Sequence, residues 1–464
     1  KVDFMSELAK EENIIMTADA NLKSPYENCY KLYGLPWWYF GIFSAVVLIA
    51  TFVGVLPQGM AGCFALMIVL GTVLQEIGDK TPIIRSYLGG GAIVILFGVG
   101  FLQYVGFFPE AVVENITAFF KPTGAFLDFY IAALITGSIL GMNRKLLVQA
   151  AARYFPAIFG GIIVSFAFAA IIGVVTGFGL VKTILLIALP IMGGGMGSGA
   201  VPLSKIFESS GTMAASEAIS IMTPAVAIGN ALSIVMGGLV VKLIKNKRMN
   251  GQGQLISGGI DPKELEISPE MQSKREHIDV KSLGIGLFAS TTFFAFGFIV
   301  AKLWSLLVPS ISIHAYAWMI ITVAIFKIFN ILPEFIEVAC YQWFQFIMKN
   351  LTGVLLVGIG LCYLELNTVI ETFSLSYLIL CLVTVIGAFL GAGLVGKWVG
   401  FYPVESGITA GLCMSNMGGT GDVAVLSAAN RMELMPFAQI SSRLGGAIIL
   451  IIGSLLLSLL GGLL

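Results

Sequence analysis

The sequence predicts an all-helical integral membrane protein, and three observations point to it: composition, the spacing of apolar runs, and two glycine-rich interruptions. Of the 464 residues, 57% are hydrophobic and 11% are charged, and the mean hydropathy is +0.94. A soluble globular chain is usually about 45–50% apolar and about 25% charged. So much apolar surface does not fit inside a water-soluble core, so lipid must solvate most of it.

The apolar runs have the length of membrane spans, since a bilayer core needs about 20 apolar residues per helix. We expect a polar N-terminal tail at residues 1–33 and about eleven transmembrane helices. The expected spans lie near residues 35–55, 60–76, 89–107, 124–141, 155–178, 212–241, 282–306, 313–331, 347–364 and 373–395, with a last one ending at Leu464. Residues 242–281 hold eight basic and six acidic residues, which is typical of a solvated linker.

Basic residues mark one side of the membrane. If the N-terminus is cytoplasmic, the loops that fall inside carry most of the flanking lysines and arginines, as the positive-inside rule requires. These residues are Lys80, Arg85, Arg144, Lys145, Arg153, Lys242, Lys245, Lys247 and Arg248. The loop with Glu110, Glu114 and a single Lys121 falls outside. This orientation places the C-terminus on the external side.

An internal repeat divides the chain. Residues 194–201 (GGMGSGAV) and 418–425 (GGTGDVAV) share five of eight residues, and both interrupt apolar runs. Four spans precede each segment and one follows it, if the span at 34–59 is set aside as extra. An odd number of spans per half gives the halves opposite orientations, which is typical of inverted-repeat secondary transporters. The expected repeats are 60–241 and 282–464, with the linker 242–281 between them.

The two glycine segments are predicted to be re-entrant hairpins, at residues 179–209 and 396–432. So many glycines do not favour a straight helix. A broken backbone at membrane depth is tolerated only where protein or a water-filled cavity satisfies its amides and carbonyls. Half-helix N-termini present free N–H groups to an anion, and free carbonyls ligate a cation. The alternative is a pair of glycine-rich surface turns.

Polar residues near these segments are candidates for a binding site. Arg443 follows the second segment, and its planar guanidinium matches a carboxylate, unless it is a cytoplasmic flanking charge. Hydroxyl and amide oxygens nearby suit a hard cation such as Na⁺, or alternatively satisfy local backbone; they belong to Asn416, Thr420, Ser441 and Ser442. Asp422 is either a cation ligand or a helix cap, and we favour the cap.

Other charges in apolar runs, Asp128, Glu217 and Lys327, are predicted to face helix interfaces without an assigned function. The six cysteines and two histidines have no metal-ligand spacing. The chain has no Walker motif, nucleophile elbow or dinucleotide fingerprint, which argues against ATP-driven transport and against an enzyme. No cofactor is expected.

Two motifs resemble those of the bacterial 2-hydroxycarboxylate transporter family. The first is residues 190–204 (PIMGGGMGSGAVPLS); the second is residues 413–422 (CMSNMGGTGD), with the Ser441–Arg443 stretch beyond it. The resemblance covers roughly residues 35–464. It implies a homodimer in the bacterial inner membrane, in which a mobile transport domain moves like an elevator against a dimerisation domain. It also implies citrate, malate or lactate as substrate, moved by Na⁺ or H⁺ symport or by precursor–product exchange.

The resemblance also implies roles for individual residues. Arg443 is similar to the family's arginine for the substrate carboxylate, and the tip positions assigned to substrate are Gly197, Gly419, Thr420, Met196 and Met417. The positions assigned to sodium are Asn416, Ser442, Met414 and Gly193. In sodium–citrate members we would expect Asn in place of Met196 and a second Arg in place of Met417.

Fewer polar contacts favour malate over a tricarboxylate. We therefore expect a secondary carrier of 2-hydroxycarboxylates, malate first and citrate or lactate next, coupled to Na⁺ symport. The alternative within the family is H⁺ coupling or exchange. A channel would conduct without uphill accumulation, and a membrane enzyme would need a clustered acid, base and nucleophile that the sequence does not offer.

Overall fold

The structure is a computed structural model that describes residues 29–85, 90–120, 125–142, 144–244, 248–256, 269–308 and 313–464. These residues are almost entirely helical, in agreement with the predicted fold class. They form two units, one ending at Leu56 and the other beginning at Pro57. Most of the predicted polar tail lies outside the described residues, as do Lys121, Lys245 and Lys247 and the side chains of Lys145 and Arg153.

The described part of the first unit, residues 29–56, contains a short β-hairpin and one helix. Strand β1 (Lys31–Leu32) pairs antiparallel with β2 (Leu35–Pro36), and α2 (Trp37–Val53) follows directly. The helix is apolar all round and exposes large side chains, among them Ile42, Val46 and Ile49. Such a helix is stable where lipid surrounds it, as expected for the extra first span.

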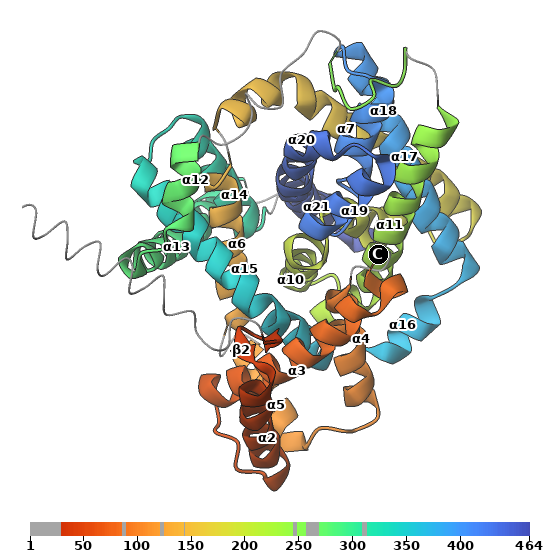
Figure 1. The fold of residues 1–464 in the computed structure, drawn as a ribbon. Coiled ribbons are helices and arrows are strands. Elements are labelled where there is room, and N and C mark those ends of the chain that lie inside the picture. The colour runs from red at the N-terminus through yellow and green to blue at the C-terminus, as the bar shows by residue number, and fades with distance from the viewer. Residues whose placement is uncertain are drawn as a thin grey trace, which may run out of the picture. The chain divides into compact units, whose positions relative to one another are not determined.

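The second unit contains two helix bundles. The outer bundle consists of α3 (Met60–Lys80), α4 (Gly91–Tyr104), α5 (Glu110–Phe120), α6 (Phe126–Leu140), α13 (Val280–Leu307), α14 (Ala315–Ile328) and α15 (Glu334–Cys362). Helix α15 packs against α3, α4, α5, α6 and α13 and is therefore its centre (Figure 1).

Two charges predicted to face interfaces have partners inside the outer bundle. Lys327 Nζ on α14 lies 2.6 Å from Glu337 Oε2 on α15, and both side chains are buried. On α6, Asp128 accepts a 2.6 Å hydrogen bond from the Tyr316 hydroxyl of α14. A buried charge is costly without such a partner, so these contacts fix α6, α14 and α15 together.

The second bundle carries both glycine segments, and we call it the hairpin bundle. Its first half is α7 (Arg144–Val175), α8 (Leu180–Thr183), η2 (Ile184–Ala188), α9 (Leu189–Met192), η3 (Met196–Ala200), α10 (Val201–Ser209) and α11 (Ala215–Leu243). Its second half is α17 (Leu375–Trp398), α18 (Pro403–Ser406), η5 (Gly407–Leu412), α19 (Gly419–Ala429), η6 (Met432–Leu434), α20 (Met435–Ile440), η7 (Ser441–Gly445), α21 (Gly446–Leu460) and η8 (Gly461–Leu463). Two further helices, α12 (Pro269–Glu276) and α16 (Leu366–Thr372), lie in connections.

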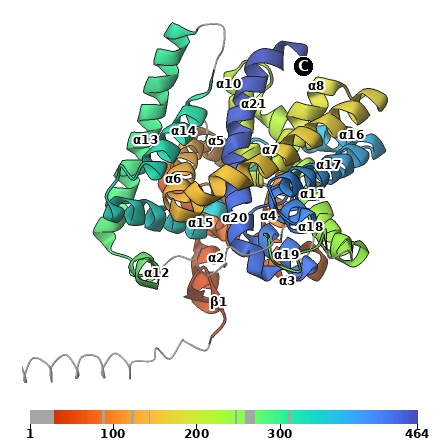
Figure 2. The same cartoon turned by 90° about the horizontal axis from the view of Figure 1, so that it is seen from above.

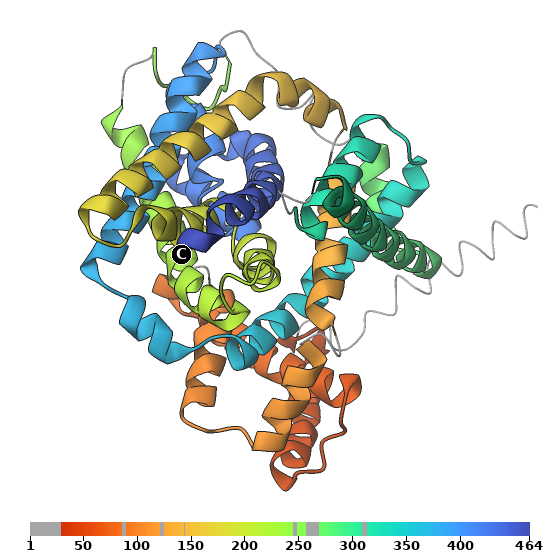
Figure 3. The ribbon, with the colours of Figure 1, turned by 180° about the vertical axis from the view of Figure 1, so that it is seen from behind.

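The two halves of the hairpin bundle pack on each other through α7 and α17 (Figure 3). A Cβ added at Gly160 of α7 would lie 2.8 Å from the Gly391 carbonyl oxygen of α17. Only glycine permits this approach, which is how helices pack closely in lipid. Helix α7 precedes the first glycine segment and α17 the second, so corresponding helices of the two predicted repeats are in direct contact.

Seven helical stretches among the described residues are long and apolar enough to cross a membrane. They are Met60–Lys80, Tyr154–Val175, Ala215–Leu243, Val280–Leu307, Glu334–Cys362, Leu375–Trp398 and Met432–Leu463. The other four predicted spans coincide with the shorter helices α2, α4, α6 and α14. A multi-pass membrane protein is therefore supported, while the total of eleven spans stays a prediction.

One predicted boundary is wrong. Helix α15 begins at Glu334 and not near residue 347, because the polar side chains in its first turns find partners. Glu337 pairs with Lys327, and the Gln342 amide donates to backbone carbonyls at the end of α12. Hydropathy alone does not show that a helix includes a polar turn whose side chains pair with other groups of the protein.

Residues 248–256, which are part of the predicted linker, are hydrogen-bonded to the rest of the protein. The Tyr402 N–H donates to the Leu255 carbonyl at 2.9 Å, and the Gly251 N–H donates to Glu405 Oε2 at 2.8 Å. Glu405 is fully buried, and Oε1 lies 3.3 Å from Arg431 Nε. The segment thus contacts residues on both sides of the second glycine tip. Residues 245–247 and 257–268 of the linker lie outside the described residues, and α12 lies in its last part.

Candidate functional site

The two glycine segments form the tips of helical hairpins, and the tips touch. The first tip, Gly193–Gly195, separates α9 from η3, and the second, Cys413–Gly418, separates η5 from α19. A Cβ added at Gly195 would lie 3.0 Å from the Met417 Cα, and one at Gly418 would lie 3.2 Å from the Gly194 oxygen. Segments more than two hundred residues apart in the sequence therefore meet backbone to backbone.

Backbone geometry explains why these positions are glycine. Gly195 has φ of 110° and Gly418 has φ of 65°, values that side-chain-bearing residues rarely adopt. The tips are also flanked by π-helical turns, η3 after the first and η5 before the second. Such turns widen the helix, change its hydrogen-bond pairing, and occur often at functional sites.

The segment that carries Arg443 lies against both tips. It is another π-helical turn, η7, which leads into the last long helix, α21 (Figure 2). The Ser442 carbonyl oxygen is 2.6 Å from the Cβ position of Gly194, and the Met414 sulfur is 2.8 Å from that of Gly445. The half-buried Arg443 guanidinium makes no hydrogen bond or ion pair with any other described residue. Its charge interacts through space with Asp422 and Tyr341.

A buried carboxylate links the second tip to the turn that carries Arg443. Asp422 is fully buried; its Oδ1 accepts from Asn416 Nδ2 at 3.0 Å and its Oδ2 accepts from the Ser442 hydroxyl at 2.8 Å. Asn416 Oδ1 in turn accepts from the Gly418 N–H at 2.7 Å. The prediction that Asp422 caps α19 is wrong, because its side chain points to Asn416 and Ser442 and the cap residue is Gly418.

The N-terminus of α19 opens next to this carboxylate. Its cap, Gly418, has no side chain to accept from the first N–H groups. Gly419 and Thr420 at the start of the helix are exposed, and nothing lies within 4 Å of the Cβ position of Gly419. Free N–H groups at an 11-residue helix attract anions. Space and the helix dipole are therefore present at the second tip, and Asp422 links this tip to the turn that carries Arg443, an arrangement suited to a carboxylate.

Comparison of the sequence with known proteins identifies the family of this chain. The sequence profile of the 2-hydroxycarboxylate transporter family matches residues 32–455. The chain belongs to this family. It is therefore a transporter and not an enzyme, and the resemblance predicted from the two motifs is confirmed.

Curated relatives of the family match nearly the full length of the chain. The citrate/sodium symporter of Salmonella typhimurium is 36% identical over 432 residues, 93% of this chain and 95% of the relative. The malate transporter MleP of Lactococcus lactis is 37% identical over 428 residues, 92% of this chain and 97% of the relative. The citrate transporter CitP of the same species is 35% identical, over 90% of this chain and 92% of the relative. Identity is almost the same to citrate and malate carriers, so it does not select a substrate.

The remaining predicted site residues are those assigned to substrate and those assigned to sodium, and the structure places the two sets differently. Gly197 faces the outer bundle, since Tyr130, Leu134 and Leu355 all lie 3.9 Å from its Cβ position. Met196 is buried, whereas Met417 is half-buried at the second tip. The positions assigned to sodium gather around η7: Asn416 and Ser442 share Asp422, the Met414 sulfur touches Gly445, and the Gly193 carbonyl faces Gly446.

Two supporting residues were missed at the sequence level. Asn230 on α11 accepts from the Met417 N–H at 3.0 Å, and the Tyr154 hydroxyl on α7 lies 2.7 Å from Ser441 Oγ. Both side chains are buried and hold backbone next to a tip. The sequence shows each of them as a polar residue within an apolar helix. Many other polar residues in this chain have the same setting and only bond to local backbone, so this pattern alone does not single them out.

Proposed function

We propose that this transporter carries malate together with Na⁺, with citrate and lactate as further substrates. The observation that carries the proposal is the unpaired Arg443 guanidinium on a turn that packs against both glycine tips. A cation at membrane depth is costly without a partner, so a transported anion is the natural counter-charge. The carboxylate would meet the fork of Arg443 and the free N–H groups of α19.

Malate, a dicarboxylate, fits this site better than citrate, a tricarboxylate. Met196 and Met417 supply thioethers where an amide and a second guanidinium would hold a third carboxylate. Burying a carboxylate without donors costs several kcal/mol. Malate leaves no carboxylate in excess of the donors, whereas citrate does.

Sodium coupling is supported by the oxygen atoms around Asp422. Hard cations prefer oxygen ligands. The Asp422 carboxylate, Asn416 Oδ1, Ser442 Oγ and nearby tip carbonyls are such ligands, and the carboxylate balances the ion's charge. The citrate/sodium symporter among the relatives makes Na⁺ the first choice. The second candidate is H⁺ coupling or exchange, and Asp422 favours it as well, because a buried carboxylate also binds a proton.

Alternating access is proposed to occur by an elevator motion of the hairpin bundle along the outer bundle. The hairpin bundle contains both tips and the turn with Arg443, so the whole site would move as one body. Contacts between the bundles include those of α14 with α7 and α21 and those of α6 with η3 and η7. We further propose a homodimer in the bacterial cell membrane, with the N-terminus cytoplasmic and the C-terminus external.

The function is tested in proteoliposomes with labelled malate, citrate, lactate and succinate, with and without imposed Na⁺ or H⁺ gradients. We expect uphill malate accumulation that requires inward Na⁺. Accumulation without either gradient and without internal substrate would contradict coupling.

Arg443→Lys tests the anion site. It should lower malate uptake at least about tenfold, because a point charge does not reproduce two charge-assisted hydrogen bonds. Arg85→Lys is the matched control, since Arg85 is exposed and follows α3 in the outer bundle. Wild-type uptake by the Arg443→Lys protein would remove Arg443 from the site.

A further inference from the structure

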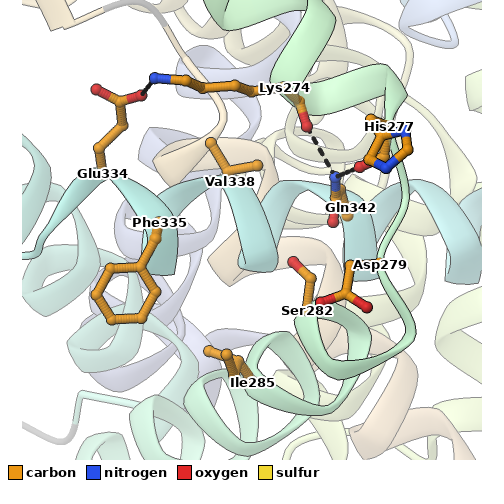
Figure 4. Close-up of a pocket in the computed structure, with 9 residues that line it drawn as sticks. All are labelled: Lys274, His277, Asp279, Ser282, Ile285, Glu334, Phe335, Val338 and Gln342. Carbon is orange, nitrogen blue, oxygen red and sulfur yellow. Dashed lines mark hydrogen bonds and ion pairs between the residues drawn. The ribbon is translucent and has the colours of Figure 1, made fainter. Parts of the chain in front are cut away.

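A pocket lies in the outer bundle, and none of its lining residues belongs to the glycine tips. It has a volume of about 560 Å³ and is formed by α12, the N-terminal turns of α13 and those of α15 (Figure 4). Its lining contains Lys274, His277, Asp279, Ser282, Ile285, Glu334, Phe335, Val338 and Gln342. This volume is in the range of small-ligand sites.

One buried side chain in this pocket lacks a partner. Gln342 is 2% exposed, and its Nε2 donates to the carbonyls of Lys274 at 3.0 Å and His277 at 2.9 Å. Because these carbonyls fix the amide nitrogen, the amide oxygen must face the opposite way. Figure 4 shows it on the side of Ser282 and Asp279. Among the described residues this oxygen has no hydrogen-bond partner, although it is buried.

The chemistry left available beside Gln342 is that of an acceptor. The Asp279 carboxylate caps α13 through Oδ1, which accepts from the Lys281 N–H at 3.3 Å, and the described residues give Oδ2 no partner. The Lys274 ammonium lies at the rim, 3.0 Å from Glu334, and this exposed pair leaves its charge able to attract an anion. An ammonium group supplies three donors and no acceptor, and so it complements Gln342 Oε1, Asp279 Oδ2 and the Ser282 hydroxyl.

The position of the pocket indicates where such an ammonium comes from. Helices α13 and α15 are both membrane-span candidates, and the pocket is at the N-terminal end of each. Large apolar side chains beside it are exposed: Ile278 57%, Val280 82% and Phe335 61%. In a membrane protein such side chains contact acyl chains, while Lys274 and His277 at the rim offer donors to a phosphate.

We propose that this pocket binds the headgroup of an aminophospholipid of the phosphatidylethanolamine type. The ammonium lies between Gln342 Oε1 and Asp279, the phosphate lies at Lys274 and His277, and the acyl chains run along Ile285 and Phe335. The bound lipid would join α12 to the ends of α13 and α15. This site is independent of the transported substrate.

Native mass spectrometry of the purified full chain tests the proposal with lipids that share the same acyl chains. Phosphatidylethanolamine should bind at least about tenfold more strongly than phosphatidylcholine, whose quaternary amine donates no hydrogen bond, because a charge-assisted hydrogen bond is lost. Phosphatidylglycerol should also bind weakly. Equal binding of the three lipids would overturn the assignment.

Variants and the free headgroup complete the test. Asp279→Asn keeps a good helix cap but removes the charge, and Ser282→Ala removes one acceptor; both should reduce the preference for phosphatidylethanolamine. Glu371→Gln, an exposed acid on α16, is the matched control and should change nothing. Soluble glycerophosphoethanolamine should bind far more weakly than the lipid. If it binds equally well, the lipid source is wrong, and if Asp279→Asn and Ser282→Ala both retain full selectivity, the site is wrong.

Discussion

At the scale of the residue, Asp422 offers the most direct test of the proposed coupling ion. It is fully buried, accepts hydrogen bonds from Asn416 and Ser442, and has no cationic side chain within ion-pair distance among the described residues. We expect Asp422→Asn to raise the Na⁺ concentration for half-maximal malate uptake at least about tenfold, because the ion loses its only charged ligand. A Na⁺ titration of uptake in proteoliposomes measures this.

The matched control is Asp128→Asn. Asp128 is also a carboxylate in an apolar helix that accepts from a hydroxyl, but it lies in the outer bundle with Tyr316. Its sodium dependence should be that of the wild type. If Asp422→Asn instead abolishes the pH dependence of uptake and leaves Na⁺ without effect, the proton-coupled alternative is correct.

The sequence predicts a site residue best where that residue type is costly at membrane depth and therefore rarely occurs there without a function. The two matching glycine segments predicted the places where the chain breaks and where the structure brings two segments together, whereas the role of Arg443 stays a prediction. The role of Asp422 was assigned incorrectly because an acid in the first turn of a helix usually caps it. Only the fold shows that Ser442, twenty residues further on, supplies its second donor.

At the scale of the element, the contact between the hairpin tips is the feature to test. Gly195→Ala places a Cβ about 3.0 Å from the Met417 backbone at a φ of 110°. The strain alone costs roughly 1–2 kcal/mol, and the steric conflict adds to it. We expect malate uptake to fall at least about tenfold, because the second tip must move away from the first.

Gly177→Ala separates backbone strain from tip contact. Gly177 has φ of 74° in the turn after α7, but nothing lies within 4 Å of its Cβ position. This variant should therefore transport at near the wild-type rate. Comparable losses in the two variants, measured as initial rates at equal amounts of protein, would mean that strain rather than the meeting of the tips matters.

Helix boundaries were predictable from the sequence where the length of an apolar run sets them. They were less predictable where polar side chains find partners inside the fold. The predicted spans near 282–306 and 373–395 agree with α13 and α17 within a few residues. The extension of α15 back to Glu334 and the attachment of residues 248–256 to Glu405 depend on pairs remote in the sequence. No local pattern encodes such pairs.

At the scale of the whole molecule, the elevator proposal requires the hairpin bundle to slide along α14. The His314 N–H of the outer bundle donates to Ser454 Oγ on α21 at 2.6 Å, which brings the two residues within disulfide reach. Cysteines at positions 314 and 454, in a background without the native cysteines, should form a disulfide on oxidation. Malate uptake should then stop and recover on reduction, because the two bundles are locked in one position.

A disulfide within the hairpin bundle gives the opposite expectation and completes the argument. A Cβ at Gly161 of α7 would lie 3.4 Å from the Ala392 Cβ of α17, close to the separation found in disulfides. Both helices would travel with the tips, so oxidation of cysteines at positions 161 and 392 should leave uptake intact. Uptake that persists with the 314–454 disulfide formed, as verified by mass spectrometry, would exclude sliding at this interface. Transport would then require the tips to open while α14 and α21 stay together.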